Sequence, residues 1–510
     1  MDKRTQEFLN DPVMPLLARM SAPNTIAFFI QSIVVLTEVW FISKLGTASL
    51  AAVALAFPLL MITQTMSGGA LGGAITSAIS RSLGANDVDK AEKLIWHAII
   101  ISIGGAMIFL SFFVLFGESL LMLLGGKDEI LSESLAYCRV LFYGGILLWL
   151  SGTLSAVLRG MGDMKFPATL MIIASFIQVF LSGCFILGWY GFPKLGVPGA
   201  AVATLISASL MVLIILLKIL SKSVIARLQL HQFILSKDLF NNIFEVAIPG
   251  SLSPLFTVGT ILVLTGLVGQ FGTEALAGYG IGSRVEFLMI PLIFGVGTAM
   301  TAIVGANIGA KNIERAEKVG ISGGLSAGFI SAFIGVLLAL FPDLWIGFFT
   351  DDPKTYLVTK KYIQIVGPFY IFQGIGLSLY FASQGANAMK WPIIATIARF
   401  AIAGLGMLAG LIQFYFGQNK IIQEDFSKNT VIGIIATDAK LSKSQCKFLA
   451  TTAHDGIARA VFPSHTSFDG DLIFSVSSVN KDLSGDPNEI LMINHAASLC
   501  VSRAIARGVY

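Results

Sequence analysis

Long apolar segments separated by short polar loops occupy the first four fifths of this 510-residue chain. Each segment holds about 20 mostly apolar residues, the length that a helix needs to cross the hydrocarbon core of a bilayer. The pattern therefore predicts eleven membrane-spanning helices. Their expected ranges are 22–42, 50–78, 94–116, 133–157, 167–188, 197–219, 243–268, 275–303, 319–341, 359–383 and 392–415.

The second half of this helical region repeats the first. Residues 84–93 read GANDVDKAEK and return at 309–318 as GAKNIERAEK, a shift of 309 − 84 = 225 residues. The same shift carries Gly160 onto Gly385. Six predicted helices separate equivalent positions, and because six is even both halves cross the membrane in the same direction. Such parallel repeats are related by an axis along the membrane normal, and we expect a substrate cavity between the two lobes.

The repeat ends before its last helix. Residues 196–201, GVPGAA, should reappear near residue 421, where the chain reads IIQEDF instead. We therefore expect an all-α polytopic membrane protein with two six-helix-type parallel repeats, the second of which is truncated, followed by a small soluble α/β tail. The predicted divisions are a first repeat at 1–220, a second repeat at 221–416, a junction at 417–428 and the tail at 429–510.

Composition agrees with a membrane protein, because 55% of the residues are hydrophobic and only 13% are charged. The net charge of +4 and the absence of a basic stripe argue against nucleic acid as a partner. The chain contains neither a CxxC pair nor a Cys/His cluster with metal-ligand spacing, so no metal site and no cofactor are predicted.

Alternate loops hold different numbers of Lys and Arg residues, and this difference indicates how the chain is oriented in the membrane. If the N-terminus is cytoplasmic, the inner segments hold sixteen Lys and Arg residues. The outer segments hold only six, which are Lys44, Lys127, Lys194, Lys354, Lys360 and Lys361. The positive-inside rule then predicts a multi-pass protein of the inner (plasma) membrane with a cytoplasmic N-terminus. An odd number of spans would place the tail on the outer side, and we expect no cleaved signal peptide.

Five motifs in the helical region resemble those of the multidrug and toxic compound extrusion (MATE) transporters. They are LGTASLAAV at 45–53, RSLGA at 81–85, LRGMGD at 158–163, GIGSRVE at 280–286 and VGANIGA at 304–310. The resemblance covers about four fifths of the chain. It implies a twelve-helix antiporter that exports small organic, often cationic, solutes across the lipid bilayer in exchange for protons or sodium ions. Here the twelfth helix is missing.

Glu38 is the leading candidate for a functional residue. It lies inside the first predicted span, where a charged side chain costs roughly 2.5–3.5 kcal/mol on insertion scales. The resemblance places a cation-coupling carboxylate, usually Asp, at this position. A carboxylate in a partly hydrated cavity could exchange a proton or sodium ion with a cationic substrate. The alternative is that Glu38 lies near the outer end of its helix and reaches water.

Weaker candidates for cation or substrate binding lie in the second half. Arg284 and Glu286 fall inside span eight, and Gln373 falls in span ten. Family members with a sodium-type site in this half carry acidic residues in helices seven and ten. This chain has no acid between residues 247 and 268 and offers only Gln373 in helix ten. Arg284 and Glu286 could instead form structural ion pairs that shape the second half.

The tail alternates short β-rich runs with helical spacing. Strands are expected near 431–437 and 471–479, and helices at 442–460 and 489–506.

Tail motifs such as NTVIG at 429–433 and AHDGIARA at 453–460 resemble the P1 peptidase family, most closely its nylon-oligomer hydrolase branch. That resemblance implies self-cleavage before Thr430, which would become an N-terminal nucleophile, with Asp469 and Asp471 as supporting acids. The family's larger upstream portion is missing. The tail is therefore either a membrane-tethered amide hydrolase or, as we expect, an inactive fusion remnant.

Overall fold

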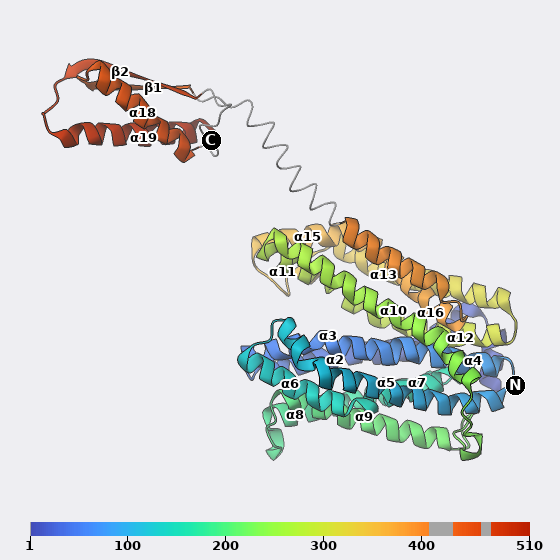
Figure 1. The fold of residues 1–510 in the computed structure, drawn as a ribbon. Helices are drawn as coiled ribbons and strands as arrows, with labels where there is room; N and C mark the ends of the chain where they lie inside the picture. The colour runs from blue at the N-terminus through green and yellow to red at the C-terminus, as the bar shows by residue number, and fades with distance from the viewer. Residues whose placement is uncertain (1, 407–431, 461–470, 510) are drawn as a thin grey trace. The chain divides into compact units, whose positions relative to one another are not determined.

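The computed structural model of the chain describes residues 2–406, 432–460 and 471–509. They belong to two compact units, Met1–Leu405 and Gly406–Tyr510 (Figure 1). The catalytic candidates Thr430 and Asp469 lie outside the described residues.

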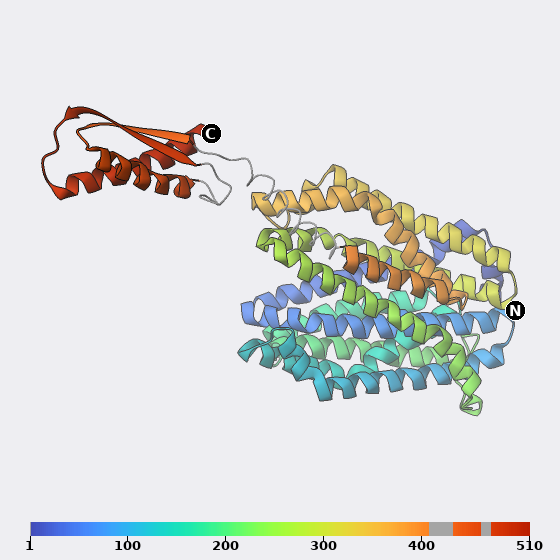
Figure 2. The same ribbon diagram turned by 45° about the horizontal axis from the view of Figure 1, so that its top comes forward.

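The larger unit is a bundle of long helices that run along one common direction (Figures 1 and 2). Its first half contains α1 (Lys3–Asn10), α2 (Val13–Ser43), α3 (Thr47–Gln64), the π-helix η1 (Thr65–Leu71), α4 (Gly72–Gly84), α5 (Val88–Leu123), α6 (Asp128–Tyr143), α7 (Gly145–Gly160), α8 (Lys165–Leu187) and α9 (Val197–Leu220).

The second half repeats this series. It contains α10 (Lys237–Val268), α11 (Thr273–Ser283), α12 (Glu286–Gly309), α13 (Ile313–Leu340), α14 (Asp343–Ile346), α15 (Pro353–Val366), the 3₁₀-helix η5 (Gly367–Phe369), α16 (Tyr370–Gly385) and a helix at 390–406.

These helices confirm the predicted membrane architecture. Within the described residues, nine helices or helix runs are long and apolar enough to cross a membrane, and a bent pair raises the number to ten. The bent pair is α6 and α7, which meet at an angle of 51° inside the fourth predicted span. The helix that corresponds to the eleventh predicted span, 392–415, begins at residue 390, and its described part ends at 406.

Reciprocal close contacts show that the two halves are related by a pseudo-two-fold axis. A Cβ atom on Gly84 would lie 2.0 Å from the carbonyl oxygen of Ala306, and one on Gly309 would lie 2.0 Å from that of Arg81. Gly84 and Gly309 are equivalent under the 225-residue shift, and so are Arg81 and Ala306. The ends of α4 and α12 therefore cross in the same way from both sides, and only glycine permits this approach.

The turns that follow α4 and α12 also match. Asn86 and Lys311 both adopt a left-handed backbone, with φ angles of 59° and 61°. The next residue then caps the following helix: Asp87 accepts a hydrogen bond from the Lys90 amide (2.9 Å), as Asn312 does from the Arg315 amide (3.3 Å). A side chain that accepts from a first-turn amide satisfies a donor that the helix leaves unpaired.

Contacts between the halves gather at one end of the bundle, which we call the basic end because the Lys- and Arg-rich loops lie there. Here the side chain of Ser77 donates to the carbonyl of Gly385 (3.1 Å), and Arg81 donates to the carbonyl of Asn242 (3.3 Å). A buried apolar cluster joins the start of the chain to the second half. It contains Phe8, Val13, Leu16, Leu17, Met20 and Met164 together with Ala299, Ile303, Ala306, Ala316 and Val319.

The smaller unit has the predicted order of strand, helix, strand and helix. Its elements are β1 (Ile432–Ala439), α18 (Lys443–Ala460), β2 (Leu472–Lys481) and α19 (Pro487–Val509). The two strands pair in parallel, with Gly433 opposite Ile473. The helices cover one face of this sheet through a small core of Leu449, Ala453, Ile457, Ile473, Ala497 and Val501.

Candidate functional site

A hydrogen-bonded carboxylate lies inside the first half of the bundle. Glu38, on α2, accepts hydrogen bonds on Oε1 from Ser182 Oγ (2.6 Å) and Gln178 Nε2 (3.0 Å). Both donors belong to α8, about 140 residues away in the sequence. The Glu38 side chain is half-buried, whereas Gln178 and Ser182 are buried.

Neighbouring polar groups hold these donors in place. Gln178 Nε2 lies 3.0 Å from the hydroxyl oxygen of Thr204 on α9, and Ser175 Oγ donates to Gln31 Oε1 at 3.0 Å. Residues 175, 178 and 182 are three and four positions apart, so they share one face of α8. Three side-chain hydrogen bonds therefore join α2 to α8 on this face, and the two that Glu38 accepts lie nearer the end of α2.

The site combines one negative charge with neutral hydrogen-bond donors. Such donors stabilise an ionised carboxylate without cancelling its charge, so the group can still take up a cation. Within the described residues, no group of three or more His, Cys, Asp or Glu side chains is arranged to hold a metal ion. The arrangement therefore suits one exchangeable monovalent cation or proton at a single carboxylate.

The second half has a different polar centre. Glu286 on α12 is hydrogen-bonded to the side chain of Gln373 on α16, and the positive charge of Arg399 acts on it. Arg399 itself donates from Nη2 to the hydroxyl of Thr257 on α10 at 2.6 Å. This carboxylate already has a cationic neighbour.

The predicted site residues thus divide between separate places. Glu286 and Gln373 come together, whereas Glu38 lies in the other half. Arg284 lies at the junction of α11 and α12, and its side chain is exposed. Asp471, the one tail candidate among the described residues, directly precedes β2 and is half-buried.

Sequence reasoning missed Gln178 and Ser182 as partners of Glu38. Their signal was present, because polar side chains at positions 175, 178 and 182 mark one face of an otherwise apolar span. Polar residues that share one face of a membrane helix indicate a protein-facing or water-facing side. What the pattern could not supply was the helix that this face contacts.

Curated relatives match most of the chain. A probable multidrug resistance protein NorM from Thermotoga maritima is 25% identical over 406 residues, which cover 78% of this chain and 86% of the relative. A FAD transporter from Shewanella oneidensis is 26% identical over 411 residues, covering 78% and 88%. The Peptidase family S58 model matches residues 381–510, which supports the hydrolase resemblance of the tail at the level of a peptidase family.

Solved structures agree with these relatives. One described as the outward-facing conformation of a multidrug resistance MATE family transporter of the MOP superfamily superposes with a TM-score of 0.72 at 26% identity. It covers 83% of this chain and 99% of the other. A MOP superfamily transporter from Pyrococcus furiosus gives 0.73 at 26% identity, covering 82% and 98%. The MatE family model matches residues 23–183 and 249–407, one block in each half. The chain therefore belongs to the MATE family of multi-pass membrane transporters.

Proposed function

We propose that the helical unit is a secondary antiporter that exports organic drugs or metabolites in exchange for protons or sodium ions. Its two pseudo-symmetric halves meet at the basic end, which is the arrangement that alternating access between two lobes requires. Relatives named as multidrug resistance proteins and a FAD transporter support organic solutes as the substrate class. MATE proteins move solutes rather than convert them, so we assign this unit no reaction.

The observation that carries this proposal is the environment of Glu38. An intramembrane carboxylate is costly unless it is used or neutralised, and Glu38 meets hydroxyl and amide donors from Ser182 and Gln178. Cation uptake at Glu38 would change the charge of the first half. A cationic or proton-linked substrate could then be released as the ion binds. We therefore assign ion coupling to Glu38.

The orientation follows from the basic loops. Lys and Arg residues concentrate at the basic end. We therefore propose that the protein lies in the inner membrane and that its basic end faces the cytoplasm. The opposite end, where Lys354 lies, would then face outward. Impermeant maleimide labelling of single cysteines at Lys222 and Lys354, in intact cells, checks this assignment, because only the second should react.

Efflux from proteoliposomes tests the coupling role. A fluorescent organic cation and FAD are loaded separately, and efflux is started by a pH or a sodium gradient. We expect one gradient to drive efflux of at least one substrate, and Glu38→Gln to remove this gradient dependence. Glu129→Gln, which neutralises an exposed carboxylate at the start of α6, is the matched control and should transport normally. Unchanged gradient-driven efflux in Glu38→Gln would refute the coupling role.

A second candidate function concerns the tail alone. The peptidase-family match and the α/β fold of residues 432–509 favour descent from a hydrolase. We propose that the tail is an inactive remnant rather than a membrane-tethered amide hydrolase. Mass spectrometry of the expressed chain tests this, and a new N-terminus at Thr430 together with amide hydrolysis that is lost in Thr430→Ala would contradict it.

A further inference from the structure

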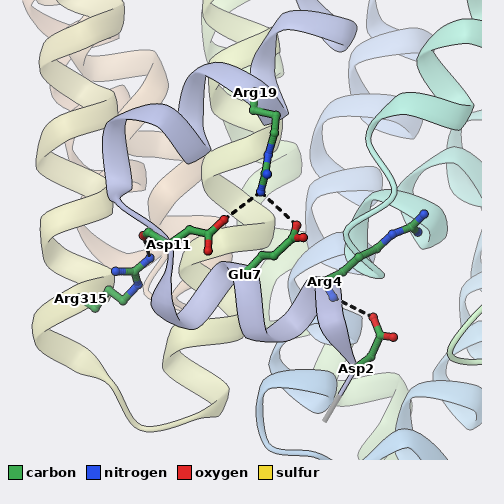
Figure 3. Close-up of polar contacts among 6 residues, drawn as sticks. All are labelled: Asp2, Arg4, Glu7, Asp11, Arg19 and Arg315. Carbon is green, nitrogen blue, oxygen red and sulfur yellow. Dashed lines mark hydrogen bonds and ion pairs between the residues drawn. The ribbon is translucent and has the colours of Figure 1, made fainter.

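The short helix α1 lies across the basic end and contacts both halves of the transporter. Figure 3 shows Glu7 of α1 and Asp11, the residue directly after α1, together with Arg19 of α2 and Arg315 of α13. Arg19 bridges Glu7 and Asp11 at 3.0 Å each, which folds α1 back against the start of α2. The segment from α1 to the start of α2 is therefore one compact piece.

This piece is held firmly by the second half. Asn307 Nδ2 and Arg315 Nε both donate to the carbonyl oxygen of Phe8, each at 3.1 Å, and Arg315 Nη2 donates to the carbonyl of Asp11. The Phe8 ring is 2% exposed and belongs to an apolar cluster built mainly from α2, α12 and α13, to which the first half also contributes Met164. Carbonyl groups at the end of a helix lack intrahelical partners, so these donors also cap α1.

Beyond α2, contact with the rest of the first half is slighter. Arg4 Nη1 lies 3.1 Å from Asp163 Oδ2 in the loop between α7 and α8, and the Arg4 side chain is 43% exposed. Beside it, the space next to Gly162 is closed by Arg4 and Phe8, because a Cβ atom there would lie 3.3 and 3.2 Å from their side chains. The Asp163 side chain is only 7% exposed, so the pair is open to solvent on its Arg4 side alone, and salt screens it from that side.

We propose that α1 is a latch of the basic end, which stays with the second half and closes on Asp163 of the first half. The inference rests on the alternating access proposed above. If the basic end opens, its two halves separate, and α1 cannot keep both sets of contacts. The Arg4–Asp163 pair and the contact of the Phe8 ring with Gly162 then part, while the hydrogen bonds that Asn307 and Arg315 donate to the Phe8 carbonyl persist. The latch therefore favours the state that is closed at the basic end.

Reversible cross-linking of the full chain tests the two contacts separately. Cys446 and Cys500, the cysteines that are not buried, are replaced by Ser. One protein then carries Arg4→Cys with Asp163→Cys, and a second carries Asp11→Cys with Arg315→Cys. A short bifunctional methanethiosulfonate joins each pair, dithiothreitol releases it, and efflux is measured before and after release. Single-cysteine variants treated in the same way are the controls.

We expect the Arg4–Asp163 cross-link to reduce efflux to the level of empty liposomes and reduction to restore it. The Asp11–Arg315 cross-link should leave efflux unchanged. Block by the second cross-link would overturn the assignment of α1 to the second half, and efflux through the first cross-link would overturn the latch. After dithiothreitol has released the cross-links, both proteins should transport. Absence of efflux at that stage would count against the proposed antiport function rather than against the latch.

A measurement without transport keeps the latch falsifiable. Spin labels on cysteines at Asp89 and Glu314, which are exposed and equivalent under the repeat, report the distance between the halves at the basic end. Arg4→Ala should increase the population with the longer distance, whereas the neighbouring exposed Lys3→Ala should not. Equal distance distributions in Arg4→Ala and the unmutated chain would contradict the proposal.

Discussion

The two halves of the transporter agree at the basic end and differ in their polar centres. Gly84 and Gly309 are equivalent under the 225-residue shift. The left-handed turns and the helix caps that follow these glycines are equivalent as well. Farther along the helices, Glu38 meets neutral donors, whereas Glu286 faces Arg399. Close helix crossings require the same small residues in both copies, because backbone atoms approach one another there. A charged centre carries no such requirement, so the copies have diverged in it.

The largest expected effect separates the two carboxylates. Glu38→Gln should weaken the dependence of efflux on the ion gradient by about 5–150-fold, the usual range for coupling between two sites. Glu286→Gln should retain most of this dependence, because the positive charge of Arg399 acts on Glu286 and disfavours the uptake of a second cation there. Initial efflux rates at graded ion concentrations measure both. If Glu286→Gln loses the dependence and Glu38→Gln keeps it, the roles of the halves are reversed.

Loss of one donor to Glu38 should change the ion affinity. A hydrogen bond to a charged group contributes about 1.5–3 kcal/mol, so Ser182→Ala should shift the half-saturating ion concentration by roughly tenfold or more. The direction identifies the ion: a proton should bind more tightly to the less stabilised carboxylate, and sodium more weakly. Ser209→Ala is the control, because Ser209 donates only to the Leu205 carbonyl of its own helix. Equal shifts in both variants would exclude a specific role for Ser182.

The shared crossing should respond symmetrically to added volume. Gly84→Val and Gly309→Val each place side-chain atoms against a backbone carbonyl of the other half, at an expected cost of about 1–3 kcal/mol. Thermal unfolding in detergent should show similar decreases in Tm. Gly104→Ala on α5 has open space around it and should not lower the Tm. A large decrease in the Tm of only one valine variant would show that the two glycine contacts are not equivalent.

The smallest effect is expected at the helix caps. Asp87→Ala and Asn312→Ala each remove a side-chain acceptor at the start of α5 or α13, and loss of such a cap typically costs about 1 kcal/mol. The same Tm measurement should give small and equal decreases. A difference between the two would mean that the caps, unlike the glycines, have acquired separate roles.

Hydropathy predicted every described span, because the bilayer sets one length for all of them. It placed helix ends less well where polar residues continue a helix beyond the apolar core. The prediction began the third span at residue 94, whereas α5 starts at Val88, directly after its capping Asp87. The bend between α6 and α7 was also missed, because it follows from how the helices pack and not from their mean hydropathy.

The site was predicted only in part, for a related reason. Glu38 was identified because a lone charge in an apolar helix is conspicuous. Its donors, Gln178 and Ser182, come from another helix, and apolar periodicity does not indicate which helices are neighbours. The N-terminal segment was expected only to be polar, and its role at the basic end depends on distant donors such as Arg315.

At the centre of the pseudo-symmetry, one residue position meets its own counterpart. Ser80 and Gly305 are equivalent under the 225-residue shift, and a Cβ atom on Gly305 would lie 2.1 Å from the Ser80 hydroxyl oxygen. Serines at both positions fit only if the Ser80 hydroxyl turns away from Gly305. With the Ser80 hydroxyl in its present position, only glycine fits at residue 305. Substitutions at this pair are constrained jointly, and exchanging the residues, Ser80→Gly with Gly305→Ser, should be tolerated where Gly305→Ser alone is not.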